Sequence, residues 1–411
     1  MTTTINNEHK KLNVPNLRFP EFQGEWEKMR LDDFTERVMR KNKDNKSKLP
    51  LTISAQYGLV DQINFFNKVI ASTDMSNYYL LKKGEFAYNK SYSSDYPWGA
   101  IKRLDNYEQG ALSSLYICFT PQDNVESDFI LQYFESPKWH KGVSEIAVEG
   151  ARNHGLLNVS VQDFFHTYHY VPKDKKEQIK IAKLLMLLDE RIATQNKIID
   201  KLQSLIKGLN DSLYAQYGNE FKTSFAKLGT SYSGLSGKSA QDFGSGKPFI
   251  TYLNVYSNNV INEKDFQYVS IKKGEKQNVV EYGDVLFTLS SETPEEVGIG
   301  SVYLGKEKVY LNSFCFGIHI INAEIAFPPY LSYYISSTPF RKFVYPYAQG
   351  STRFNLCKAD FEKASIKLPT LENQKRIYSI LSHIDSKIET ERQMLDLYNS
   401  QKQYLLRQMF I

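Results

Sequence analysis

The feature that most constrains this fold is an internal repeat with a period close to 200 residues. Residues 158–164 recur as residues 355–361, and Pro172 recurs as Pro369, both 197 positions further along. Solenoid repeats are shorter, at roughly 20–50 residues per unit. The chain is therefore predicted to contain two copies of a larger unit, related by a pseudo-two-fold internal repeat.

Each copy ends in a predicted long helix with an unbroken apolar seam. The seam advances in alternating steps of four and three residues for about 33 residues, or about 50 Å of helix. This spacing indicates a coiled coil, and we expect the two helices to pair antiparallel. Two ordinary amphipathic helices, each covering its own domain, remain the alternative. The seam positions expected to set the pairing are Leu185, Leu188, Ile192, Gln195, Ile199 and Leu202 in the first helix, and Leu381, Ile384, Ile388, Glu391 and Leu395 in the second.

One seam position is polar in both helices. Gln195 and Glu391 occupy it, and each lies near the middle of its helix. If the helices pair about a pseudo-two-fold axis, equivalent residues near the centre meet. Our hypothesis is that the two side chains hydrogen-bond there and fix the register, as buried polar pairs can. The alternative, that both point to solvent, stays open.

The regions outside the helices are rich in short β-type runs punctuated by Gly, Asn, Asp and Ser. Each region is predicted to be a compact α+β domain. The predicted fold class is α+β, with two globular domains separated by two long helices. The predicted boundaries are 1–172 for the first domain, 173–217 for the first helix, 218–368 for the second domain and 369–411 for the second helix.

The composition narrows the class of protein. A hydrophobic content of 41% over 411 residues excludes a disordered chain. The net charge of +5 permits nucleic-acid binding without requiring it. Two of the three cysteines lie in apolar strand-like runs, and none has zinc-ligand spacing. With no bilayer-length apolar run and no apolar N-terminal signal segment, we expect a cytoplasmic protein with no membrane partner.

Catalytic motifs of a DNA-modifying enzyme are not found. Phe327-Pro-Pro-Tyr330 resembles a methyltransferase tetrapeptide but has Phe where an amide or carboxylate must hold the target amino group. Gly298-Ile-Gly300 is too short for a cofactor loop. The one histidine cluster, at positions 154, 166 and 169, is expected in solvent and at a strand edge. We therefore predict no catalytic, cofactor-binding or metal-binding residues in this chain.

Several loops mix amide, hydroxyl, cationic and aromatic side chains, the groups that contact phosphates and base edges. The loops around residues 152 and 353 are equivalent in the repeat and pair Gly with one Arg. Ordinary solvated surface is the alternative interpretation, as it is for the basic run at 37–48. The candidate DNA-binding residues are Gln56, Tyr57, Lys90, Ser91, Tyr92, Trp98, Arg152, Asn153, Lys238, Lys247, Ser351, Thr352 and Arg353.

The order of domains and helices resembles the specificity subunit of type I restriction–modification enzymes over nearly the whole chain. The most specific elements are Gly350-Ser-Thr-Arg353 ahead of Leu-Pro369-Thr-Leu-Glu372-Asn-Gln374, and Gly150-Ala-Arg152 ahead of Val-Pro172. The opening residues 14–26 also resemble this family. The first copy departs slightly, with one residue more between Pro172 and Gln178 than between Pro369 and Gln374.

The resemblance implies a non-catalytic DNA-reading role. Each domain would be a target recognition domain that reads half of a bipartite, asymmetric site in double-stranded DNA. The paired helices would set the spacer and dock two modification subunits, which methylate adenine. S-adenosylmethionine, ATP and Mg are expected in the partner subunits, and restriction subunits join the full complex.

Other classes of protein remain as alternatives at this point. The chain could be a stand-alone duplicated DNA-binding protein without methyltransferase partners. A self-sufficient DNA-modifying enzyme conflicts with the missing motifs. A coiled-coil adaptor that binds only proteins is a further alternative. DNA retention that falls steeply with salt would exclude it, because this dependence is typical of binding to phosphates.

Overall fold

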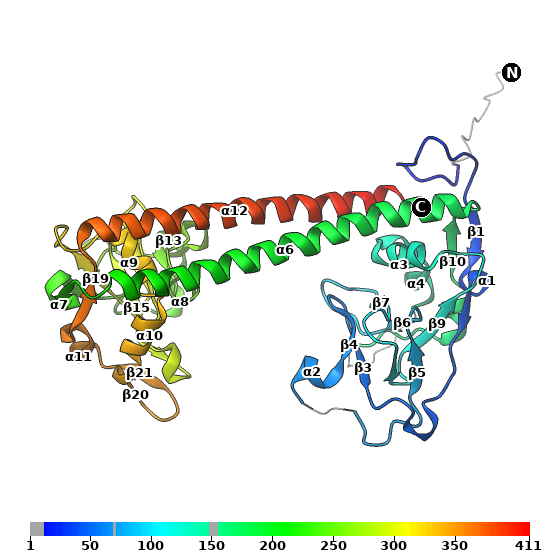
Figure 1. Cartoon of the computed structure of the whole chain (residues 1–411), viewed down its shortest axis with the longest axis horizontal. Coiled ribbons are helices and arrows are strands. Elements are labelled where there is room, and N and C mark those ends of the chain that lie inside the picture. Colours follow the sequence, from blue (N-terminus) through cyan, green and yellow to red (C-terminus); the bar gives the residue numbers. More distant parts are fainter. Residues whose placement is uncertain (1–11, 69–70, 148–154) are drawn as a thin grey trace. The chain divides into compact units, whose positions relative to one another are not determined.

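The computed structural model describes residues 12–68, 71–147 and 155–411 and divides the chain into two compact units. Unit 1 comprises Met1–Asn196 and Met394–Ile411, and unit 2 comprises Lys197–Gln393. Both divisions fall inside the two long helices, α6 (Lys175–Tyr217) and α12 (Leu371–Gln408). Each unit therefore holds one α+β domain and one segment of each helix (Figure 1).

Unit 1 is built on an antiparallel sheet in the order β2-β9-β6-β7. A second sheet has the order β4-β3-β8-β5, and β1 pairs with β10. The strands are β1 (Glu27–Arg30), β2 (Thr35–Arg37), β3 (Pro50–Ser54), β4 (Gly58–Asp61), β5 (Tyr79–Lys82), β6 (Phe86–Asn89), β7 (Ala100–Arg103), β8 (Gln109–Leu112), β9 (Ile117–Pro121) and β10 (Tyr168–Val171). The short helices are α1 (Leu31–Phe34), α2 (Gln62–Phe66), α3 (Ser127–Glu135), α4 (His140–Ile146) and α5 (Val161–Phe165).

Unit 2 repeats this plan with an antiparallel sheet β12-β19-β15-β17 and smaller sheets β14-β13-β18, β11-β22 and β16-β21-β20. The strands are β11 (Phe221–Thr223), β12 (Gly229–Ser233), β13 (Phe243–Ile250), β14 (Gln267–Val269), β15 (Val285–Thr288), β16 (Ser290–Ser291), β17 (Gly300–Val302), β18 (Tyr310–Leu311), β19 (Cys315–Ile320), β20 (Ala348–Gln349), β21 (Phe354–Leu356) and β22 (Ile366–Leu368). The short helices are α7 (Phe225–Leu228), α8 (Tyr252–Ser257), α9 (Pro328–Tyr334), α10 (Thr338–Val344) and α11 (Lys358–Lys363).

The predicted repeat is visible in the register of the strands. Phe86 lies opposite Phe119 in unit 1, and Val285 lies opposite Ile318 in unit 2. Each residue of the second pair lies 199 positions after its counterpart in the first pair. All of these side chains are buried and form the core between the main sheet and the short helices. The α+β class and the internal repeat predicted from the sequence are thus confirmed.

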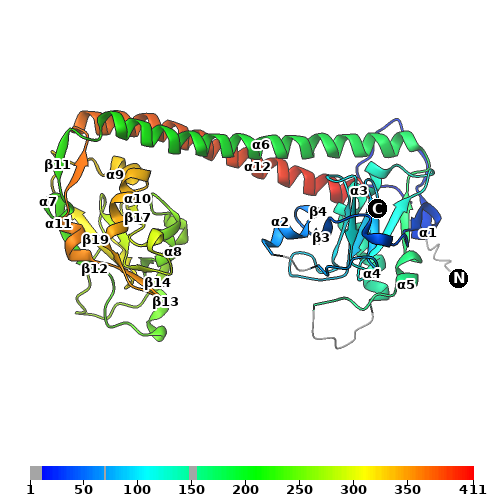
Figure 2. The same ribbon diagram turned by 60° about the horizontal axis from the view of Figure 1, so that its bottom comes forward.

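The two long helices pack antiparallel within each unit. In unit 1, Leu185 near the start of α6 and Leu405 near the end of α12 share one core, and Lys402 pairs with Asp189 at 2.5 Å. In unit 2, Leu381 near the start of α12 shares a core with Leu209 near the end of α6. Figures 1 and 2 both show these segments side by side within their units.

The seam positions predicted from the sequence are buried or half-buried, while most residues between them are exposed. Gln195 is buried in unit 1, and Glu391 is half-buried in unit 2, where it pairs with Lys387 of the same helix. The proposed contact between Gln195 and Glu391 stays a prediction. Among the described residues, neither long helix nor any shorter one is long and apolar enough to cross a membrane.

Candidate nucleic-acid interface

The connection between β6 and β7 carries four candidate residues of unit 1, Lys90 to Tyr92 and Trp98. Ser91 forms a β-bridge with Leu156, and the Tyr92 amide donates to the Gly155 carbonyl at 2.9 Å. This connection therefore lies against the segment that directly follows Arg152 and Asn153 in the chain. Those two candidates fall outside the described residues.

The side chains of this connection divide into anchored and exposed ones. The Lys90 ammonium donates to the Val159 carbonyl at 3.2 Å, and Trp98 packs on the core while its carbonyl accepts from Tyr88 at 2.9 Å. Ser91 is exposed and Tyr92 is 50% exposed. Lys90 and Trp98 thus help to hold the loop, while Ser91 and Tyr92 remain exposed at the surface.

Gln56 and Tyr57 lie in the exposed turn between β3 and β4. Tyr57 is 68% exposed and contacts Phe65 edge-to-face at 6.2 Å, and Phe65 contacts Phe66 at 5.0 Å. The exposed aromatic pair on α2 was missed by the sequence analysis. The signal available in the sequence was two adjacent Phe residues between polar ones, Asn64 and Asn67.

In unit 2, Ser351, Thr352 and Arg353 form the exposed tip of the hairpin between β20 and β21. Gly350 precedes them with φ of +145°, and a Cβ there would lie 2.1 Å from the Arg353 carbonyl oxygen. Only glycine fits this turn without displacement. The turn consequently projects the three candidate side chains away from the sheet.

Each unit places the same two loops next to each other. In unit 1 Ser91 faces Leu156, and in unit 2 Ser290 faces Asn355, again 199 positions further along for both partners. In each unit the loop after the central strand therefore lies beside the segment that follows the Arg-containing loop. The sequence pattern alone did not show this contact, because the two segments are about 65 residues apart in each copy.

The two lysine candidates of unit 2 differ in environment. The Lys238 ammonium donates to the Ser270 carbonyl and pairs with Glu275, both at 2.6 Å, and its side chain is 6% exposed. The hydrogen bond that Lys238 donates to the Glu275 carboxylate lowers the pKa of Glu275 to about 2. Lys247 is exposed on β13 beside a register shift in the β13–β14 pairing. Of the two, Lys247 has the accessible charge.

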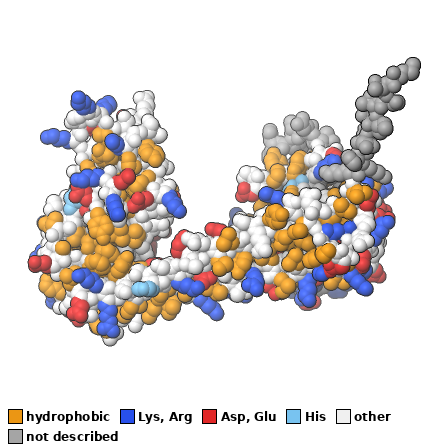
Figure 3. Space-filling model, turned by 90° about the horizontal axis from the view of Figure 1, so that it is seen from above, with side chains coloured by type: hydrophobic (Ala, Val, Ile, Leu, Met, Phe, Trp, Pro, Cys, Tyr) orange, Lys and Arg blue, Asp and Glu red, His pale blue; other side chains and the backbone are white. Residues whose placement is uncertain are grey.

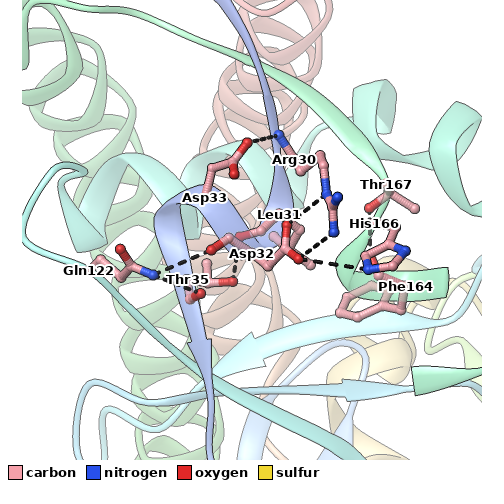
Figure 4. A network of polar contacts seen from close by, with 9 residues as sticks. All are labelled: Arg30, Leu31, Asp32, Asp33, Thr35, Gln122, Phe164, His166 and Thr167. Carbon is pink, nitrogen blue, oxygen red and sulfur yellow. Dashed lines mark hydrogen bonds and ion pairs between the residues drawn. The ribbon is translucent and has the colours of Figure 1, made fainter. Parts of the chain in front are cut away.

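An acidic pair and a histidine near the start of unit 1 are joined by local contacts rather than gathered around a cavity (Figure 4). The Asp33 carboxylate accepts from the Arg30 amide at 2.7 Å, and Asp32 binds the Arg30 guanidinium at 2.6 and 3.0 Å. His166 lies 3.8 Å from Asp32. These groups fix the start of α1 against the end of α5.

His169 corrects the expectation that the histidine cluster lies in solvent. It is 2% exposed, with Nδ1 2.8 Å from the Tyr133 hydroxyl and Nε2 2.8 Å from the Thr167 hydroxyl. Burial lowers its pKa to about 3, so the ring is neutral at physiological pH. The expectation is wrong for His169 because α3 covers the inner face of β10 at this point.

The charges on one face of the molecule are dispersed. On the face shown in Figure 3, Lys and Arg side chains are scattered among Asp, Glu and neutral side chains. This agrees with the small excess of 51 basic over 46 acidic residues. On this face the positive charge is therefore carried by individual side chains rather than gathered in one broad basic patch.

Comparison with known proteins supports the resemblance seen in the sequence. Residues 235–397 match the family model of the type I restriction modification DNA specificity domain. A putative type I restriction enzyme MjaX specificity subunit from Methanocaldococcus jannaschii is 27% identical over 184 residues. That alignment covers 43% of this chain and 42% of the relative, so the matched region spans less than half of the curated protein.

Two solved structures extend the likeness to the whole fold. One, described as part of the assembly and conformational transition of a type I restriction–modification system, has a TM-score of 0.57 at 16% identity and covers 93% of this chain and 96% of its own. The specificity subunit from M. genitalium has a TM-score of 0.52 at 14% identity and covers 97% and 99%. At these identities the likeness concerns the fold. The resemblance to type I specificity subunits is confirmed by the domain match and by this shared fold.

Proposed function

We propose that this chain, which carries a type I restriction modification DNA specificity domain at 235–397 and has the fold of the specificity subunits, is the DNA-reading subunit of such a complex. Each unit reads one half of a bipartite site in double-stranded DNA. The chain itself is non-catalytic, and the chemistry belongs to its partners.

The observation that carries this proposal is the duplicated loop cluster. Both units place the connection after the central strand beside the segment following an Arg-containing loop, in the same register. The residues at equivalent positions differ, with Tyr92 in unit 1 where Ser291 stands in unit 2. Equivalent scaffolds with different side chains read different base sequences, so the target is asymmetric.

The long helices give the proposal its second part. Their exposed faces dock two modification subunits, which use S-adenosylmethionine to methylate a flipped adenine. Restriction subunits that use ATP and Mg join the same core. The helices also set the unread spacer, since about 50 Å of helix corresponds to about 15 base pairs of B-DNA.

Methylome sequencing of a strain with and without the gene tests the function directly. We expect one bipartite, non-palindromic adenine-methylation motif that disappears when this chain is removed. A motif that persists without the chain, or DNA binding by the chain alone with no partner on gel filtration, would instead support a stand-alone DNA-binding protein.

The spacer role has its own test. Insertion of four residues into α6 near position 200 should lengthen the unread gap while both half-sites stay the same. An equal insertion in the loop at 272–275, outside both helices, serves as the control and should leave the gap unchanged. A motif with an unaltered gap in the helix variant would refute the ruler.

A further inference from the structure

The connection between β15 and β17 presents a carboxylate, that of Glu296, held by hydroxyl groups of three residues, Ser291, Tyr256 and Thr293. Ser291 Oγ donates to Glu296 Oε2 at 2.9 Å, and the Tyr256 hydroxyl also donates to the Glu296 carboxylate. These residues come from three separate elements, namely β16, α8 and the short 3-10 turn at Pro294–Glu296. The carboxylate therefore has a defined orientation although it lies at the surface.

The backbone on both sides of Glu296 is fixed by one side chain from α10. The Arg341 guanidinium donates to the carbonyls of Glu295, Val297 and Gly298 at 2.8, 2.7 and 2.7 Å. Three hydrogen bonds from one planar group hold the turn in a single conformation. The position of the Glu296 side chain is thus set before any ligand arrives.

Glu296 shares its surroundings with the Arg-containing hairpin. Ser291, which binds its carboxylate, pairs with Phe354 directly after the hairpin tip. Burial raises the pKa of Tyr252, the charge of Glu296 also raises it, and the charge of Arg353 lowers it. The ring of Tyr252 stacks on that of Tyr256, with 6.0 Å between the ring centroids. The carboxylate therefore belongs to the same loop cluster that is proposed to contact DNA.

The negative charge of Glu296 restricts which groups of the DNA it can face. Its charge repels phosphates, guanine O6 and N7, and thymine O4, all of which are acceptors. It retains acceptor capacity after its three hydroxyl partners are satisfied, because an ionised carboxylate has about four acceptor positions. In the major groove, cytosine N4 has an acceptor on one side only, guanine O6 of its own base pair, whereas adenine N6 is flanked by acceptors on both sides, its own N7 and thymine O4.

We propose that Glu296 is a specificity-determining residue of unit 2 that accepts a hydrogen bond from cytosine N4 in the major groove. The inference rests on the proposed function and deepens it by assigning one base. The hydrogen bond from Tyr256 lowers the pKa of Glu296, which keeps it an ionised acceptor at neutral pH. Arg353, whose charge acts on Tyr252 in the same loop cluster, would offset part of the repulsion between this carboxylate and the DNA backbone.

The test uses the whole chain with its modification subunits. Glu296→Gln should make one cytosine position of one half-site degenerate, while the other half-site and the gap stay the same. Against duplexes substituted at that position, the wild type should discriminate about 5- to 150-fold, and the variant should lose this preference. Glu295→Gln removes the same charge one residue away and should leave the motif unchanged.

Tyr256→Phe provides an independent variant, since it keeps the carboxylate and removes one tether. It should weaken discrimination at the same position as Glu296→Gln. An unchanged motif in both variants, or a wild-type half-site without any C·G pair, would overturn the assignment of Glu296. Absence of a bipartite motif in the wild type would overturn the proposed function itself, so the two failures are distinguishable.

Discussion

Gln178 and Gln374 occupy equivalent positions in the two units and make the same pair of hydrogen bonds. Each side-chain amide donates to the carbonyl of the proline before its long helix, Pro172 at 2.8 Å and Pro369 at 2.9 Å. Each side-chain oxygen accepts, at 2.8 Å, from the backbone amide that begins α3 in unit 1 or α9 in unit 2. In both units one buried glutamine therefore ties the long helix to the domain that it carries.

Removal of this glutamine should destabilise the unit that holds it. Gln374 is fully buried, so Gln374→Ala leaves backbone groups without partners and should cost about 1–3 kcal/mol in the free energy of unfolding. Gln178→Ala should behave alike in unit 1. Urea denaturation measures the loss, and Gln401→Ala, at an exposed position of α12, is the matched control. Equal stability of the two α12 variants would contradict the linking role of Gln374.

The stability of unit 1 should fall in mild acid because of His169. Its folded-state pKa of about 3 lies below the ordinary value of 6.5, so the unfolded chain binds more protons between these limits. The contribution of the neutral ring to stability is fully present well above pH 6.5 and is lost as the pH falls toward 3. Between pH 7.5 and 5.5 this group should account for a loss of about 1.4 kcal/mol.

His169→Gln removes the titration at this site. Urea unfolding of unit 1 followed at the two pH values should then show a smaller difference than in the wild type. The exposed His166 offers the control, since His166→Gln should preserve the pH dependence. A wild-type slope retained in His169→Gln would assign the acid sensitivity to other groups.

The two lysines of unit 2 should respond differently to substitution. Lys247→Ala removes an exposed charge and should reduce the slope of log affinity against log salt by about 1. Lys238→Ala should leave that slope unchanged, because its ammonium is already engaged by Ser270 and Glu275. DNA titrations at several salt concentrations check both. A slope reduced by about 1 in Lys238→Ala would place Lys238 at the DNA, and an unchanged slope in Lys247→Ala would contradict a phosphate contact of Lys247.

Gly350→Ala should disturb the hairpin tip. A Cβ at this position would overlap the Arg353 carbonyl, and the φ of +145° is unfavourable for alanine. We expect weaker DNA binding and a lower melting temperature. Gly208→Ala is the contrasting variant, because Gly208 lies in α6 with open space around it, and alanine there should stabilise by about 1 kcal/mol. Stabilisation in both variants would contradict the strained turn.

Much of the architecture is readable from the sequence because its signals are local and periodic. The seam spacing predicts the helices α6 and α12, and the repeat predicts two similar α+β units. The equivalence of the two glutamines was visible as a matched position but not as a hydrogen-bonding role. Their partners lie in segments about 50 residues upstream, beyond the reach of any local pattern.

The candidate site shows the same division more sharply. The loops around positions 90 and 353 were predicted from side-chain chemistry. The contacts of the connections after β6 and β15 with the segments after the Arg-containing loops required the folded chain. Composition also cannot separate Lys238 from Lys247, since accessibility depends on Glu275 and Ser270 from a distant loop.

The sequence by itself determined the duplicated order of domain and long helix, because heptad spacing and repeated motifs are properties of neighbouring residues. Only the tertiary structure decided which charged groups remain accessible at the surface. Lys238 is neutralised within unit 2, His169 is enclosed and neutral, and the turn bearing Glu296 is locked by Arg341 from α10. Each outcome depends on a contact between segments far apart in the chain, and such contacts exist only after folding brings the segments together.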